Sequence, residues 1–171
     1  ILKEEYGTDI EVAVEAATLV YGGGFPRNDN SPRHTYHAQR IIYATTKELE
    51  SLAEEVNQNA KIVLCDRGSL DGAVYWPYGE ADFLKTMGTT IKDEYANYYA
   101  VIHMSPPKEA KYYQNTSVRT ESLERALEVD EAILKLWSGH PRHIVIPESN
   151  DYVKKALIVR KAIRKIINGE I

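Results

Sequence analysis

The chain has 171 residues, 43% hydrophobic and 27% charged, which fits one globular domain with a full core and argues against disorder. Its net charge of −4 does not favour nucleic acid as a partner. No apolar run approaches the length of a membrane span, so we expect none. Cys65 is the single cysteine. A disulfide within the chain is therefore impossible, which favours a reducing, cytoplasmic location.

The first third of the chain predicts a helix end, a strand, a loop and a long helix. Residues 1–7 resemble the tail of a helix that Gly7 closes, so we expect further sequence upstream. Residues 11–14 predict a short strand that leads into Glu15, followed by a loop rich in Gly, Pro and Asn. From about Thr35 to Val56, apolar residues recur at helical spacing.

The remaining elements alternate between short apolar strands and helices. Strands are expected at 61–65, 98–104 and 142–148, with helix and turn at 75–95, a helix that Thr120 caps, and a final helix from about Asp151 to Asn168. This alternation predicts the α/β class, with a three-layer, parallel sheet covered by helices on both faces. In such sheets, ligands bind at the carboxyl ends of the strands.

Charged residues follow the strands at that edge. Glu15 follows the first visible strand, and Asp66 and Arg67 follow the second. An apolar strand that ends in Asp is typical of a Walker B acid, which holds Mg²⁺ beside nucleotide phosphates. The neighbouring Arg would contact a phosphate through its planar fork. On spacing alone, Asp66 and Arg67 are explained equally well as an acid at a helix N-terminus and a surface Arg.

Five segments in order carry a family resemblance: EAATLVYGGGFPR, VLCDRGSLDGAVYWP, VIHMSPP, RTES and GHPRHIVIPESNDYVKKA. Together they resemble the NadR-like P-loop ATPase domain family, an AAA-type family related to ribosylnicotinamide and nucleoside kinases. The resemblance covers about residues 11–165. It implies one P-loop NTPase-type domain over residues 1–171, with a parallel sheet between helices.

One part of that family's pattern is absent from these residues. The family begins with a strand and a G-x-x-x-x-G-K-[ST] loop that wraps phosphates with backbone N–H groups. No such motif occurs in the sequence, and YGGGFPR lacks the Lys and the Ser or Thr. We therefore expect the first strand and the phosphate-binding loop to lie upstream.

The resemblance implies roles for four residues near the predicted sheet edge. Asp66 would be the Mg²⁺-associated acid, and Arg67 would lie near the acceptor and the transferred phosphoryl group. Glu15 would meet the acceptor hydroxyl as a base, although capping a helix is an alternative role. Arg27 would hold an anionic acceptor, and its alternative is a solvated loop residue.

The resemblance also implies a lid and a base-binding loop. Arg119 and Arg125 would neutralise transition-state charge in the lid. For Arg125, an ion pair with Glu121 or Glu128 is the alternative. Asn150 would read the edge of the nucleotide base, and it is also expected as the N-cap of the final helix.

Asp130 needs a separate explanation. It falls on an apolar helix stripe between Ala126 and Leu134, so its carboxylate should have a partner. A structural salt bridge is the favoured explanation, and a role in the functional site is the alternative.

The expected function is a kinase-like phosphotransferase that uses ATP or GTP with Mg²⁺ and acts on a small, nucleoside-like acceptor. The alternative is a nucleotide-binding regulatory module that transfers no phosphoryl group. The two differ on the acceptor side, where a kinase should form a pocket from Glu15, Arg27 and the GGGFPR loop.

Overall fold

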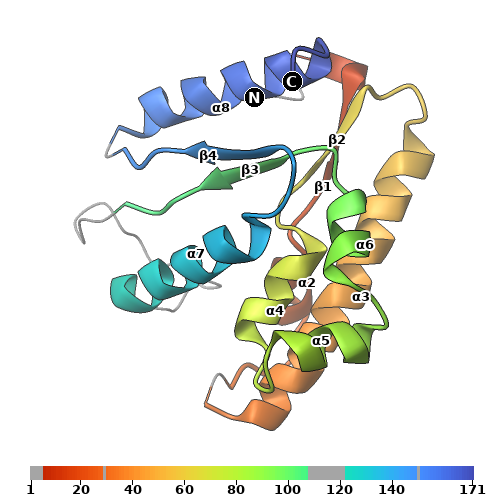
Figure 1. Cartoon of the computed structure of the whole chain (residues 1–171). Coiled ribbons are helices and arrows are strands. Elements are labelled where there is room, and N and C mark those ends of the chain that lie inside the picture. The colour runs from red at the N-terminus through yellow and green to blue at the C-terminus, as the bar shows by residue number, and fades with distance from the viewer. Residues whose placement is uncertain (1–5, 29, 108–121, 150) are drawn as a thin grey trace. The chain divides into compact units, whose positions relative to one another are not determined.

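The computed structural model describes residues 6–28, 30–107, 122–149 and 151–171 (Figure 1). It divides into two compact units, the first ending at Glu94 and the second beginning at Tyr95. Each unit combines helices with a pair of strands, and each is described separately.

The first unit contains most of the helices. In chain order its elements are η1 (Gly7–Asp9), β1 (Ile10–Ala13), α2 (Ala16–Gly22), α3 (Pro32–Val56), β2 (Ile62–Cys65), η2 (Ser69–Asp71), α4 (Gly72–Tyr75), α5 (Glu80–Met87) and α6 (Ile91–Ala96), which runs across the boundary. Helix α3 begins at Pro32, earlier than expected, because Ser31 caps it by accepting a hydrogen bond from the His34 backbone N–H at 3.4 Å.

Strands β1 and β2 are parallel neighbours. Their register runs from Ile10 opposite Ile62 to Ala13 opposite Cys65. The ladder continues one step further, where the Asp66 N–H donates to the Ala13 carbonyl at 2.9 Å. Helices α2 and α3 form the crossover that a parallel pair requires. The sequence did not predict α2: residues 16–20 were assigned to no element, and the loop was expected to begin at Tyr21.

The core of the first unit is partly aromatic. Phe83 and Leu70 are fully buried, and Trp76 is nearly so. The Phe83 ring lies 5.5 Å from the Trp76 ring and 5.8 Å from the Tyr43 ring, in edge-on contacts that aromatic pairs prefer. These contacts join α3, α5 and the residue that follows α4.

The second unit is a strand pair between two helices. Its elements are β3 (Val101–Met104), α7 (Leu123–Trp137), β4 (His143–Ile146) and α8 (Tyr152–Ile167), with β3 and β4 parallel from Val101 opposite His143 to Met104 opposite Ile146. Figure 1 shows α7 and α8 on opposite sides of this pair.

Both helix starts in the second unit differ from the expected caps. Ser122, not Thr120, caps α7 by accepting from the Arg125 N–H at 3.2 Å. Asp151, not Asn150, caps α8 by accepting from the Lys154 N–H at 3.0 Å. Ser and Asp are both strong N-cap residues, so a sequence with several candidates in a row does not decide between them.

The α/β class is confirmed, with helices alternating with short parallel strands. Within the part of the chain that the structure describes, the strands form two two-stranded sheets, β1–β2 and β3–β4. The three-layer arrangement around one sheet therefore stays a prediction. No helix among the described residues is long and apolar enough to cross a membrane.

Candidate functional site

The carboxyl ends of β1 and β2 bring an acidic pair to one edge. Glu15 comes two residues after β1, and Asp66 comes directly after β2. Because the strands are parallel and in register, both residues leave the sheet at the same end. The Asp66 side chain is exposed there, while its backbone stays tied to β1.

Arg67 adopts an unusual backbone conformation at this edge. Among the described residues it is the one residue other than glycine with a positive φ, 81°. Such conformations are costly for a residue with a Cβ and persist when the surroundings fix them. One contact that helps to fix Arg67 is its ion pair with Asp71, in which Nε lies 3.1 Å from Oδ2.

Negative groups surround the Arg67 guanidinium. Partial burial lowers its pKa, but Asp71, followed by Tyr75, Glu15 and Asp66, raises it more, so the pKa lies above its ordinary value. The guanidinium is therefore a permanent positive charge beside three carboxylates. A guanidinium can meet a phosphate through its planar fork, but the carboxylates offset its charge, so a cation would have to balance them for an anion to bind here.

The loop behind Arg67 is anchored to a buried acid. Ser69 donates a hydrogen bond to Glu94, whose side chain is almost completely buried. Asp71, Ser69 and Glu94 were not predicted from the sequence as parts of this site. The Arg67–Asp71 pair has a local signal in its spacing of four residues, whereas Ser69 and Glu94 are 25 residues apart and have none.

Aromatic side chains from α3 and from the segment after α4 form a cluster in the first unit. The Tyr36 ring lies 4.7 Å from the Trp76 ring and 6.0 Å from the Tyr78 ring, and the Arg40 guanidinium stands over Tyr36. Trp76 is buried and its Nε1 donates to Asp82 at 2.7 Å. Tyr78, in contrast, is 58% exposed. The cluster thus combines a packed base with an accessible aromatic face.

The two predicted acceptor residues lie at opposite ends of α2. Glu15 occupies the N-cap position of that helix, and its carboxylate accepts a hydrogen bond from the Thr18 hydroxyl. Arg27 lies beyond the C-terminal end and stands over the Tyr21 ring, 5.1 Å from its centre. The structure brings Glu15, but not Arg27, to the edge that carries Asp66.

In the second unit, two predicted residues have structural partners. Arg125 pairs with Glu128 at 2.9 Å, and both side chains are more than half exposed. The Asp130 Oδ1 lies 2.9 Å from the His103 Nε2, which supplies the partner expected for this carboxylate. Arg119 and Asn150 lie outside the described residues, so the structure does not locate them.

Two further groups, Lys155 and His143, lie near opposite ends of the parallel β3–β4 pair. Lys155 donates to the Ser105 carbonyl, and burial lowers its pKa although Asp130 and Glu148 oppose this. Burial, with His103 and His140, lowers the pKa of His143, so this imidazole is neutral at pH 7. Across the described ranges, no three His, Cys, Asp or Glu side chains are placed to hold a metal ion.

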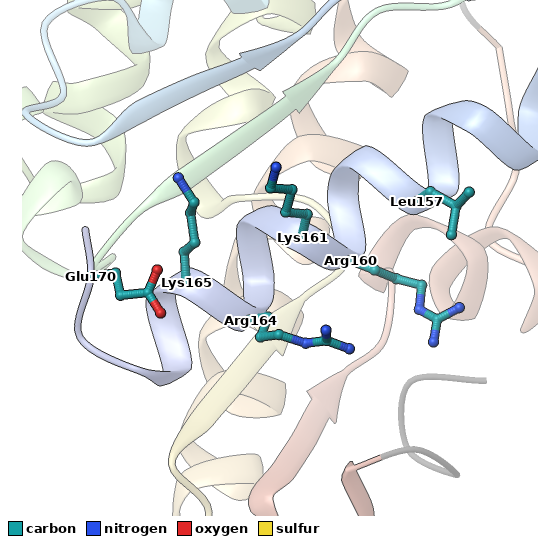
Figure 2. Close-up of a pocket in the computed structure, with 6 residues that line it drawn as sticks. All are labelled: Leu157, Arg160, Lys161, Arg164, Lys165 and Glu170. Atoms are coloured by element: carbon teal, nitrogen blue, oxygen red, sulfur yellow. The ribbon is translucent and has the colours of Figure 1, made fainter.

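A separate pocket lies on the C-terminal half of α8 (Figure 2). It is lined by Leu157, Arg160, Lys161, Arg164, Lys165 and Glu170. Figure 2 shows the arginines on one side of the helix and the lysines on the other, so their charges do not converge. Arg164 and Lys165 lie in the last turn, where positive charge complements the helix dipole. None of the predicted site residues lines this pocket.

Comparison with known proteins decides the family. A family model described as an AAA domain matches residues 1–155. The chain belongs to the AAA domain family. This places it among nucleotide-binding P-loop NTPases, in agreement with its parallel strands and with the acid that ends β2. No curated protein and no solved structure matches this AAA domain.

Proposed function

We propose that this AAA domain is a kinase-like phosphotransferase that binds ATP or GTP with Mg²⁺ and phosphorylates a small, nucleoside-like acceptor. One observation carries the proposal. An acid, Asp66, and a guanidinium, Arg67, directly follow the parallel strand β2, and Glu15, which comes two residues after β1, raises the pKa of that guanidinium. Phosphoryl transfer depends on positioning and charge neutralisation, and this edge offers both.

The donor chemistry at the edge fits Mg²⁺. This ion is usually bound by one or two carboxylates together with waters and substrate phosphates. Asp66 would hold it, because its carboxylate is exposed while its backbone is fixed to β1. When bound, the ion neutralises charge on the phosphate oxygens.

The proposal needs a loop that wraps the phosphates. Residues 1–171 contain no G-x-x-x-x-G-K-[ST] sequence. We place this loop, with the first strand of a three-layer sheet, in sequence upstream of Ile1. The resemblance to NadR-like domains supports this placement, as does membership of a P-loop family.

Arg67 and Glu15 are assigned to the acceptor side. Asp71 pairs with the Arg67 guanidinium through Nε, and we assign the terminal nitrogens of this guanidinium to a phosphate oxygen. Glu15 would take the proton from the acceptor hydroxyl as that oxygen forms its bond to the γ-phosphorus, while the bond from this phosphorus to the bridging oxygen breaks and ADP or GDP leaves. Its hydrogen bond from Thr18 fixes the carboxylate for this task. The exposed face of Tyr78 suits an acceptor that carries a flat ring.

The remaining assignments concern the nucleotide and the acceptor charge. We assign Arg119 and Arg125 to the lid over the transferred group, and Asn150 to the base of the nucleotide. Arg125 would have to exchange its exposed pairing with Glu128 for the phosphate, at little cost. Arg27 would bind an anionic part of the acceptor.

Replacing Asp66 tests the proposal. The variant Asp66→Asn keeps the size of the side chain and removes its charge, so we expect weaker Mg-nucleotide binding and a loss of turnover of roughly 100-fold or more. Thermal unfolding should be unchanged, because the side chain is exposed. Asp93→Asn, at an exposed acid on α6, is the matched control and should keep full activity.

Two results would contradict parts of this proposal. Unchanged turnover in the Asp66→Asn variant would remove Asp66 from the metal site. Nucleotide binding by the wild type without transfer to any of a panel of nucleosides would favour a regulatory module over a kinase.

A further inference from the structure

A buried carboxylate lies behind the loop that carries Arg67. The Glu94 side chain is 1% exposed and accepts three hydrogen bonds, all from hydroxyl groups. Tyr43 and Thr89 each donate at 2.7 Å to Oε1, and Ser69 donates to Oε2. Burying a carboxylate is costly unless it is hydrogen-bonded, and these donors satisfy both of its oxygens.

The three hydroxyls come from three different segments. Tyr43 belongs to α3, Ser69 to η2, and Thr89 to the connection between α5 and α6. A single buried side chain therefore ties the loop after β2 to two neighbouring segments. Hydrogen bonds to a charged acceptor are shorter and stronger than neutral ones, so this tie is stiff.

Ser69, which is hydrogen-bonded to Glu94, lies only two residues after Arg67 in the chain. Ser69 is the first residue of η2, and Asp71 is the last. The Asp71 carboxylate holds the Arg67 Nε at 3.1 Å, and the intervening Leu70 is fully buried. Moving Ser69 would therefore move both Asp71 and the guanidinium that it holds.

We propose that Glu94, acting through Ser69, is a positioning residue for Arg67 in phosphoryl transfer. This inference rests on the proposed function, because it assigns Arg67 to the transferred group. Glu94 touches no substrate in this account. Its role is to hold the η2 loop so that the guanidinium reaches the phosphate in one fixed orientation.

Tyr43 and Thr89 provide matched controls for this role. Each of them, like Ser69, donates one hydroxyl hydrogen bond to the same carboxylate. Tyr43→Phe and Thr89→Val remove these hydroxyls with little change in shape. A merely structural role predicts that all three deletions lower stability and leave kcat similar. The positioning role predicts that Ser69→Ala alone lowers kcat.

The test measures kcat, KM, Mg-nucleotide affinity and thermal unfolding for the three variants in the full-length protein. We expect Ser69→Ala to lower kcat by roughly 10- to 100-fold, with nucleotide affinity kept, because small misplacements have effects of this size. Tyr43→Phe and Thr89→Val should keep the wild-type kcat. Equal kcat values in all three variants would overturn the proposal.

A double variant separates positioning from a general loss of packing. Arg67→Lys keeps the charge but loses the Nε contact with Asp71, so the link to Ser69 is already broken. We expect Ser69→Ala to add no further loss of kcat in that background. The same loss with and without Arg67→Lys would overturn the proposal.

Glu94→Ala supplies an independent arm, since it removes the acceptor of the Ser69 hydroxyl together with that of the Tyr43 and Thr89 hydroxyls. We expect it to repeat the kcat loss of Ser69→Ala, and a wild-type kcat would overturn the proposal. Should this buried variant fail to fold, the Ser69→Ala comparison decides alone. A wild-type protein without nucleotide turnover would overturn the proposed function itself, and this inference with it.

Discussion

At Arg67 the backbone conformation and the side-chain chemistry make opposing demands. A φ of 81° suits glycine, yet the position carries a guanidinium held by Asp71. For a residue with a Cβ this conformation costs roughly 1 to 2 kcal/mol. We infer that the strain is offset by the ties of the η2 loop, above all by Leu70 and Ser69, which are both buried.

Two substitutions at Arg67 separate strain from function. Arg67→Ala keeps the strained backbone, and Arg67→Gly relieves it, while both remove the guanidinium. We expect the glycine variant to have the higher free energy of unfolding, by roughly 1 kcal/mol, and both variants to lose turnover equally. Urea denaturation measures the free energy of unfolding of the two variants.

The control for this pair is Glu48, an exposed residue of α3. In an ordinary helix glycine is less stable than alanine by roughly 1 kcal/mol, so Glu48→Gly should unfold more easily than Glu48→Ala. The order at Arg67 should be the reverse. The same order at both positions would contradict the interpretation of strain.

Individual site residues were predictable where their signal is local. The strand ends that expose Asp66, and the need of Asp130 for a partner, both follow from the order of residues along the chain. The partner itself, His103, comes from a strand 27 residues away and was not predicted. Ser69 and Glu94 are likewise joined only by the tertiary fold.

At the scale of elements, the sequence predicted the strands better than the helix starts. All four strands lie inside or next to their expected ranges, because short apolar runs between polar turns are distinctive. Helix α2 was missed because its seven residues end in the first of several glycines, which favoured a loop. The caps of α7 and α8 fall one or two residues beyond the expected positions.

The contact between β2 and α3 has a chemical consequence at Cys65. Burial, followed by the Glu50 carboxylate of α3, raises the pKa of this thiol to about 12. Cys65 is therefore neutral at physiological pH and is no nucleophile. Its side chain acts as a small apolar group at the end of β2.

This raised pKa predicts a loss of stability at alkaline pH. The unfolded thiol has its ordinary pKa of 9.0, whereas the pKa of the folded thiol is raised to about 12. The stabilisation is therefore fully present below pH 9 and is lost as the pH rises from 9 to 12, by at most about 1.4 kcal/mol per pH unit.

Denaturation of wild type and of Cys65→Ala between pH 8 and pH 11 checks this prediction. The tyrosines titrate in both proteins, including Tyr43, whose pKa burial and Glu94 raise above its usual range. The difference between the two curves thus isolates Cys65. Parallel curves would show that α3 does not shield the thiol.

At the scale of the whole molecule, the family match joins the two units. It runs from residue 1 to residue 155, across the boundary between Glu94 and Tyr95. Both units therefore belong to the AAA domain, and both carry a parallel strand pair followed by polar residues. Because the net charge is −4, the molecule as a whole does not attract polyanions. Binding of an anionic nucleotide would depend on local groups such as Arg67.

Calorimetric titration of the full-length protein with ATP and with GTP, each with and without Mg²⁺, tests the central claim most directly. We predict binding of at least one nucleotide, with an affinity that falls when Mg²⁺ is chelated and in the Asp66→Asn variant. Circular dichroism on the same sample confirms that the protein is folded. A folded protein that binds neither nucleotide would contradict the account, and Asp66 and Arg67 would then be no more than the charged end of a strand.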